Sequence, residues 1–318
     1  RYLDGRIALA EDVLDRTRHD PNFAPLAHHY IDAFTRARAT YSERSGVLNL
    51  GIEGTMYAGA FAGFATAAAT GSPLIGLAAA LVVGVLAGAI MAFLTVTLGA
   101  NQHVSGIGLT IMLIGVAEFA NRLIFTGTDL QRIEPMPLLD PLAVLGPGGE
   151  VFRQYALTYV AFLLVVPVAW WVLQHSSFGL EIRAVGENPE AADAAGVNVA
   201  RTRYLALMIG GALMAIGGAF FTLAVLGSFT LDIIAGRGWV CVALVIFGRW
   251  RIGRGVLGAL VFSFVYSLQF RLRILPGFGE LPFELLLALP YLVVILALAL
   301  SGRNVAYPGA YLKPYRRS

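Results

Sequence analysis

The sequence predicts an all-α fold, a polytopic transmembrane helical bundle with about eight spans. Hydrophobic residues make up 57% of the 318 residues, charged residues make up 14%, and the mean hydropathy is +0.71. A soluble domain is about half apolar and about one quarter charged, so a soluble enzyme is nearly excluded. The 36 glycines point the same way, because small residues let transmembrane helices pack closely.

The spans are predicted from the length of the apolar segments. A helix needs about 20 mainly apolar residues to cross the hydrocarbon core of a bilayer. Eight segments meet or nearly meet this length: 46–69, 73–98, 104–125, 154–174, 203–226, 232–248, 255–270 and 283–301. The sixth and seventh are short, so the number of spans is open by one.

Small residues within these spans predict close helix packing. Gly59 and Gly63, and then Ala80, Gly84 and Gly88, recur at four-residue spacing. Such spacing places small residues on one helix face and lets two backbones approach each other. Four further glycines do the same in the fifth span, at positions 210, 211, 217 and 218.

Basic residues predict the orientation of the bundle. Cytoplasmic loops carry an excess of Arg and Lys. With eight spans, 17 of the 23 basic residues fall on one side, and these segments are 1–45, 99–103, 175–203, 249–254 and 302–318. The opposite side carries five, and Arg122 lies within a span. Both termini are therefore expected in the cytoplasm.

The chain divides into two parts by charge. Residues 1–46 hold 14 of the 43 charged residues, and from Gly46 onward the composition is that of a membrane protein. We expect a polar, atypical N-terminal segment, 1–45, followed by a transmembrane domain, 46–318. The cytoplasmic loop 175–203 belongs to the second part.

The residue inventory excludes several chemistries. Cys241 is the only cysteine, so no disulfide or thiolate cluster can form within the chain. The only lysine is Lys313, which precedes Pro314, so the Gly-Lys-Ser/Thr of a phosphate-binding loop is absent. No catalytic constellation and no metal site are expected, and the scattered arginines do not suit nucleic-acid binding.

Polar residues near the ends of the early spans are candidates for a substrate pathway. Asn49 and Glu53 are four residues apart, so the predicted helix 46–69 would place both on one face. A membrane-embedded Glu faces protein, water or a pathway, and it can equally lock neighbouring helices together. Asn101 and Gln102, in the turn before the third span, could line a gate or lie in a solvated turn.

A second charged pair lies toward the outer end of the third span. Glu118 precedes Arg122 by four residues, the favourable orientation for an ion pair along one helix. An ion site is the other interpretation. Together with Glu53, this pair motivates one alternative function, a secondary transporter driven by an ion gradient. A membrane scaffold without transport of its own is another.

The most informative loop segment is Glu181–Val199. Asn188 is a good N-cap, Pro189 suits the first turn of a helix, and Gly196 suits its end. The alanines between them predict a helix of about two turns with a surface of small side chains. Such a helix is well shaped to dock into a groove on another protein.

Several motifs together resemble one protein family. The Glu-Ala-Ala and Gly pattern of Glu190–Gly196 looks like the coupling helix of ABC importer permeases. The segment Ser42–Gly54, SERSGVLNLGIEG, resembles the opening signature of the nucleoside and simple-sugar branch of the branched-chain amino acid permease family. Five other segments resemble the same branch in order: Asn101–Gly106, Arg183–Pro189, Ala235–Trp239, Ile246–Trp250 and Pro314–Arg317.

The resemblance implies a permease subunit of an ATP-driven ABC importer of a nucleoside or simple sugar, in a cytoplasmic (inner) membrane of bacterial type. It implies three partners: a cytoplasmic ABC ATPase that binds ATP and Mg, a second related permease, and an extracytoplasmic substrate-binding lipoprotein. No cofactor is implied in this chain. By position, the contact with the ATPase would involve Gly186, Glu187, Asn188, Ala191, Ala192 and Gly196.

The chain departs from the family at its start, and the substrate ligands stay open. Similar proteins have a hydrophobic span before the Ser42 motif, whereas residues 31–41 contain Asp32, Arg36 and Arg38. Inserting these charged residues into a bilayer would cost much free energy, so one helix of the family is expected to be absent. Aromatic residues such as Phe220, Phe221 and Trp239 could stack on a base or serve as packing residues.

Overall fold

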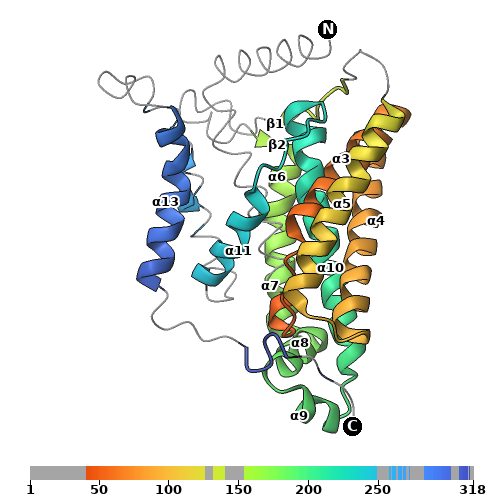
Figure 1. The fold of residues 1–318 in the computed structure, drawn as a ribbon, viewed down its shortest axis with the longest axis vertical. Helices are drawn as coiled ribbons and strands as arrows, with labels where there is room; N and C mark the ends of the chain where they lie inside the picture. The colour runs from red at the N-terminus through yellow and green to blue at the C-terminus, as the bar shows by residue number, and fades with distance from the viewer. Residues whose placement is uncertain are drawn as a thin grey trace.

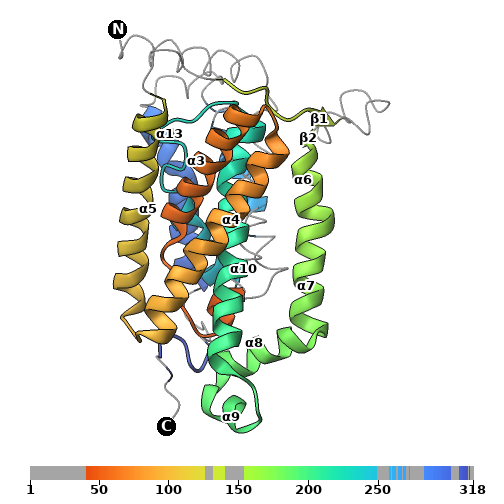
Figure 2. The same ribbon diagram turned by 90° about the vertical axis from the view of Figure 1, so that its right-hand side faces the viewer.

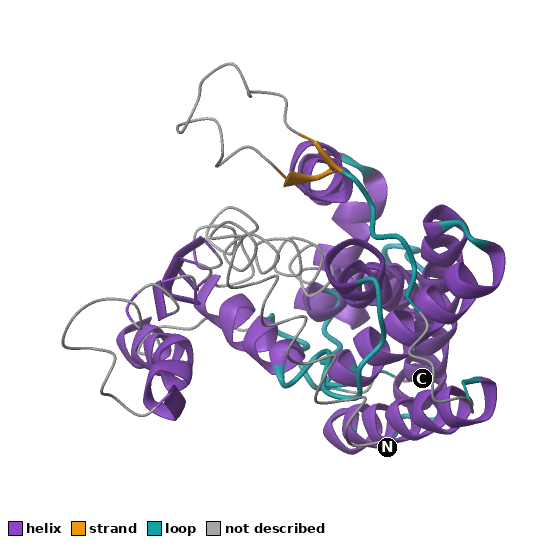
Figure 3. Cartoon of the chain, turned by 90° about the horizontal axis from the view of Figure 1, so that it is seen from above, coloured by secondary structure: helices purple, strands orange, loops and turns teal. Residues whose placement is uncertain are grey.

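The structure is mainly helical, with very little strand, over the residues that it describes. This computed structural model describes residues 41–125, 132–139 and 154–248, scattered positions between 258 and 272, and residues 283–301, 308–313 and 315. In these ranges the strands are β1 (Leu138–Leu139) and β2 (Gln154–Tyr155), which pair antiparallel (Figure 3). The predicted all-α fold is confirmed.

Long helices alternate with short interruptions along the chain (Figure 1). The helices are α3 (Ile52–Thr70), α4 (Pro73–Ala92), α5 (Gln102–Ile124), α6 (Ala156–Val160), α7 (Val166–His175), α8 (Ser177–Glu187), α9 (Pro189–Ala194), α10 (Val199–Phe220), α11 (Arg237–Gly248) and α13 (Phe283–Ser301). Wider π-helical turns extend α4, join α6 to α7 and extend α10; they are η1 (Phe93–Thr97), η4 (Ala161–Val165) and η5 (Phe221–Leu226).

Four helical stretches of the described residues are long and apolar enough to cross a membrane. They are Pro73–Thr97, Gln102–Ile124, Ala156–His175 and Val199–Leu226, close to the second to fifth predicted spans. α13 reproduces the bounds of the eighth prediction. The total of about eight is not confirmed, because α11 has only 12 residues and 255–270 is described only at scattered positions.

The first predicted span, 46–69, is corrected by the structure. α3 begins at Ile52, and the residues before it follow a non-helical path that starts with Gly46 at a φ of 87°. Asn49 therefore precedes the helix and does not share a helix face with Glu53. Once α3 has begun it runs through the protein interior, and 13 of its 19 residues are buried.

The core of the bundle is the packing of α10 against α3 and α4, where glycines bring the backbones together. A Cβ added at Gly84 would overlap the carbonyl oxygen of Gly211, and one at Gly88 would overlap that of Leu207. Gly59 meets Ala215 on α10 in the same way. The close approach predicted from the small residues is confirmed, and α10 is the central helix of the bundle.

We expect Gly84→Leu to lower the thermal stability of the purified protein in detergent. The new side chain has no room between α4 and α10, and overpacking of a core costs about 1–3 kcal/mol. Gly115→Leu on α5 is the matched control, because a Cβ there meets nothing within 4 Å. Equal melting temperatures for the two variants in a thermal-shift assay would contradict this account of the packing.

Several loops that are distant in sequence gather at one end of the bundle. Helices α8 and α9, the α4–α5 connection and residues 308–313 lie at this end, and β1 and β2 lie at the other (Figures 1 and 2). This arrangement is the one predicted for 99–103, 175–203 and the described part of 302–318. The predicted loop 249–254 and residues 1–40 of the polar N-terminal segment lie outside the described residues.

Candidate functional site: the break before α3 and the α8–α9 elbow

The break before α3, residues Gly46–Gly51, is a buried stretch of non-helical backbone. Val47 is 1% exposed and Leu48 is 5% exposed. Irregular backbone at membrane depth is tolerated only where it is buried in protein or lines a cavity, because its polar groups need partners. The break therefore depends on hydrogen bonds from neighbouring elements.

Side chains from the predicted pathway supply some of those bonds. The Gln102 Oε1 atom accepts a hydrogen bond from the main-chain N of Leu48 at 2.7 Å. Within the break, Asn49 Oδ1 accepts from the N of Gly51 at 2.8 Å. On α5, Thr110 Oγ1 donates to the carbonyl of Leu50 at 3.2 Å. The start of α5 thus holds the break in place.

Asn101 has a different role from its neighbour. It is exposed and caps α5, its Oδ1 accepting from the main-chain N of His103 and Val104 at 3.0 and 3.3 Å. The helix therefore begins at Gln102, two residues earlier than predicted. Gln102 is only 5% exposed, so it lies in the protein interior and not in a solvated turn.

Glu53 joins α3 to the start of α11. Its Oε1 accepts from the main-chain N of Gly236 at 2.7 Å, and its Oε2 accepts from that of Gly238 at 2.8 Å. The first amides of a helix have no partner within the helix, and a carboxylate satisfies both their hydrogen bonding and their partial positive charge. Glu53 therefore caps α11 from a different helix, which agrees with the interpretation that it locks neighbouring helices.

The sequence motif Ala235–Trp239 supplies the matching backbone. Gly236 has a φ of 81°, and a Cβ at Gly238 would come within 2.5 Å of Glu53 Oε2, so glycine fits both positions. The Arg237 side chain turns back to donate to the carbonyls of Ile233 and Ile234 at 2.9 and 3.1 Å. Its guanidinium carbon lies 5.1 Å from the ring centre of Phe221.

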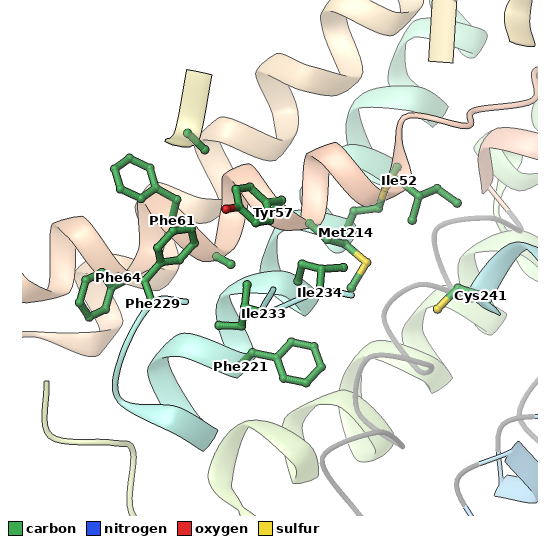
Figure 4. Packing of buried hydrophobic residues seen from close by; sticks show 13 residues of the cluster. Ile52, Tyr57, Phe61, Phe64, Met214, Phe221, Phe229, Ile233, Ile234 and Cys241 are labelled. Carbon is green, nitrogen blue, oxygen red and sulfur yellow. The ribbon is translucent and has the colours of Figure 1, made fainter. Parts of the chain in front are cut away.

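A buried apolar cluster surrounds this junction (Figure 4). Phe229, in the loop before α11, packs edge-on against Tyr57 and Phe61 with ring centres 5.3 Å apart in both pairs. Of the aromatic residues proposed for base stacking, Phe220 and Phe221 are buried in the core. Trp239 is 44% exposed.

The short helix predicted in the loop 175–203 is confirmed as α9. Asn188 Oδ1 accepts from the main-chain N of Ala191 at 3.0 Å, and Pro189 is the first helical residue. At the other end, the N of Gly196 donates to Asp193 O and the N of Val197 donates to Ala192 O, with Gly196 at a φ of 88°. This bond pair is the Schellman ending of a helix.

The six residues expected to contact the ATPase divide into an exposed and a buried group. Glu187, Asn188, Ala191 and Gly196 are exposed. Ala192 is 5% exposed and packs with Val185 and Val199. Gly186 is also buried at the elbow between α8 and α9, where a Cβ would overlap the main-chain oxygen of Arg44.

The C-terminal segment, residues 308–313 and 315, contacts this elbow, which the sequence did not predict. The N of Ala310 donates to the carbonyl of Gly186 at 2.8 Å, and the N of Gly309 donates to Glu187 Oε2 at 3.3 Å. The Tyr315 hydroxyl bonds Asp193 Oδ2 at 3.0 Å. The motif Pro314–Arg317 was the only signal in the sequence for this region.

The charged pair on α5 is present at the limit of ion-pair distance. Arg122 Nη2 lies 4.0 Å from Glu118 Oε2, and the Arg122 side chain is 76% exposed. An ion pair of this length contributes little to stability. In the part of the chain that the structure describes, no group of three or more His, Cys, Asp and Glu residues could hold a metal ion.

The chain is similar in sequence to the members of one protein family. The family model described as "Branched-chain amino acid transport system / permease component" matches residues 40–298. The chain is 37% identical to the "Putative glucose ABC transporter permease protein TsgC13" of Haloferax volcanii, over 87% of this chain and 91% of the relative. No solved structure matches the chain.

Two relatives come from Bacillus subtilis. The chain is 35% identical to the guanosine ABC transporter permease protein NupQ, over 88% of this chain and 91% of the relative. It is 29% identical to the guanosine ABC transporter permease protein NupP, over 60% of this chain and 58% of the relative.

Proposed function

The chain belongs to the family of branched-chain amino acid transport system permease components, and we propose that it is the membrane-spanning permease subunit of an ATP-driven importer for a nucleoside or a simple sugar. The observation that carries the proposal is α9, a short capped helix with exposed small residues that is held by the buried Gly186 elbow at one end of the bundle. A short helix held in this way is suited to dock on another protein and to transmit that protein's movement to the bundle.

The energy for transport would come from a partner. The chain has a single lysine, Lys313, and no Gly-Lys-Ser/Thr sequence, so the ATP and Mg are assigned to a cytoplasmic ATPase. In this proposal, closure of the ATPase on ATP moves α9, and the elbow transmits the movement to the bundle. The end that carries α9 and residues 308–313 then faces the cytoplasm.

The substrate pathway is assigned to the region around the break before α3. Transporters place binding sites where helices are interrupted near the middle of the membrane, because freed backbone groups and helix ends can contact the substrate. Asn49 lies in this break and Glu53 follows it in α3, where it caps α11. Gln102 bonds the break, and Asn101 caps α5, the helix that holds it. Nucleoside and sugar both remain substrate classes, since the relatives are named for guanosine and for glucose.

The proposed assembly has three further components in a cytoplasmic (inner) membrane. A second permease is supported by the two guanosine permeases of one organism, NupQ and NupP, which both resemble this chain. A cytoplasmic ATPase and an extracytoplasmic substrate-binding lipoprotein complete it.

The test is uptake by the assembled complex in proteoliposomes, with radiolabelled guanosine and glucose as the probes. Uptake of one of them is expected with ATP inside and without any ion gradient. Uptake that is independent of ATP and collapses with an ionophore would instead support a secondary transporter, for which the 4.0 Å Glu118–Arg122 pair is weak support.

We expect Ala191→Arg to reduce copurification of the ATPase by about tenfold or more, because a large charged side chain on the exposed face of α9 would block a close contact. Ala69→Arg is the matched control, since Ala69 is also exposed but lies near the far end of α3. Full copurification of the ATPase with Ala191→Arg would remove α9 as the docking element.

A further inference from the structure

Arg203, in the second turn of α10, is a charged residue in the protein interior. Its side chain is 1% exposed, and it is one of the largest fully buried side chains of the described chain. Buried arginines are rare, because removing a charge from water is costly unless the charge is paired. A charged residue at this position therefore indicates a function that depends on its hydrogen bonds, which an apolar residue could not make.

The contacts of Arg203 are with two main-chain carbonyls from distant parts of the sequence. Its Nε donates to the carbonyl of Ser45 at 3.2 Å, and its Nη1 lies 3.5 Å from the carbonyl of Lys313. Its Nη2 is buried without a hydrogen-bond partner in the described part of the chain. The guanidinium thus bridges the segment before the break and the C-terminal segment.

These two segments are also attached to each other and to the elbow. The N of Leu312 donates to the carbonyl of Gly46 at 3.2 Å, and the N of Ala310 donates to that of Gly186 at 2.8 Å. Gly186 itself packs against the main chain of Arg44. The segment before the break, the C-terminal segment and the elbow are therefore joined to one another, and Arg203 bonds the first two.

The segment before the break is anchored to the bundle as well. The Tyr41 hydroxyl donates to the carbonyl of Ala169 at 3.0 Å, and burial raises the pKa of this phenol to about 12. Four residues after Ser45, Asn49 begins the turn that leads into α3 and Glu53. A displacement of the elbow that reached Ser45 would therefore reach the break directly.

We infer that Arg203 is a positioning residue through which α9 and the segment Tyr41–Gly51 move as one unit, so that movement of α9 by the ATPase changes the path around the break. This inference rests on the proposed function. It assigns the C-terminal segment a mechanical role, because one of the two carbonyls bound by Arg203 belongs to Lys313.

The test compares Arg203→Gln and Arg203→Lys with the matched control Arg201→Gln, whose side chain is exposed one half-turn earlier on the same helix. Each complex is reconstituted with its ATPase and lipoprotein, and ATP hydrolysis is measured together with uptake of guanosine and glucose. For Arg203→Gln, ATP hydrolysis is expected to persist while the substrate transported per ATP falls by about three- to tenfold. Arg203→Lys should lie between Arg203→Gln and the unmodified chain, and Arg201→Gln should match the unmodified chain.

A merely structural role would give a different result. Hydrolysis and uptake would then fall together, with an unchanged ratio, and the inference would be overturned. If the Arg203 variants do not assemble, Tyr315→Phe removes one bond at the other end of the C-terminal segment and keeps the ring. It must lower the same ratio, and an unchanged ratio there would also overturn the inference.

Hydrogen exchange separates this inference from the proposed function. If the unmodified complex takes up neither probe with ATP, the proposed function fails, and the linkage is judged by exchange on the purified chain. Arg203→Gln is expected to raise amide exchange in residues 44–48 and 309–313 together, because Arg203 bonds both segments. Faster exchange in one segment alone, or an equal effect of Arg201→Gln, would overturn the linkage.

Discussion

Replacing Gly186 by valine is expected to abolish ATP-dependent uptake and copurification of the ATPase. Even the Cβ of a larger residue would overlap the main-chain oxygen of Arg44, and the carbonyl of Gly186 is already bonded to the N of Ala310. Neither neighbour is the end of a movable side chain, so α8 would have to shift away from Tyr41–Gly46. The elbow and the surface that it presents would be lost together.

The control for this variant is a glycine with open space around it, away from α8 and α9. A Cβ added at Gly108, on α5, meets nothing within 4 Å. Gly108→Val should therefore retain most uptake. Uptake by Gly186→Val at the level of Gly108→Val would show that the elbow is not needed for transport.

Replacing Glu53 by glutamine or alanine is expected to lower uptake at least as strongly as any change in the predicted pathway. Each hydrogen bond to a charged group is worth about 1.5–3 kcal/mol, and Glu53 accepts two from the start of α11. Glutamine can accept only on its oxygen and would face the second N–H with its own donors. Both variants should also lower the melting temperature in detergent.

The matched control is Glu118→Gln on α5. Glu118 is also an acidic residue in an apolar helix, but its pair with Arg122 is 4.0 Å long and the Arg122 side chain is 76% exposed. Its loss should leave uptake and melting temperature close to those of the unmodified chain. If Glu53→Gln kept full stability and lost only uptake, Glu53 would be a substrate ligand in place of a helix cap.

The features that the sequence predicted well are those determined by local patterns. Asn188, Pro189 and Gly196 specify both ends of α9 through bonds between residues 188 and 197, and the caps were correct at each position. Gly84 and Gly88 specify a close contact because a missing side chain has the same effect whichever helix faces it. The apolar stretch 73–98 likewise became a single helical span, Pro73–Thr97.

The features that the sequence did not predict depend on contacts between distant residues. Helix α3 starts at Ile52 and not at 46 because Gln102 and Thr110, on a later helix, hold the break in its non-helical path. Arg203 was counted as a cytoplasmic loop residue, since its carbonyl partners lie 158 and 110 residues away in the sequence. Periodicity and charge carry no information about such partners.

Lys313 gives the C-terminal segment an experimental use. Its carbonyl accepts from Arg203, while the residue itself is exposed, and no other lysine occurs in the 318 residues. An amine-reactive fluorophore would therefore label a single side chain of this sequence, beside the elbow and at the end of the bundle that carries α9. Its emission would report the local environment there during ATP turnover without any introduced cysteine.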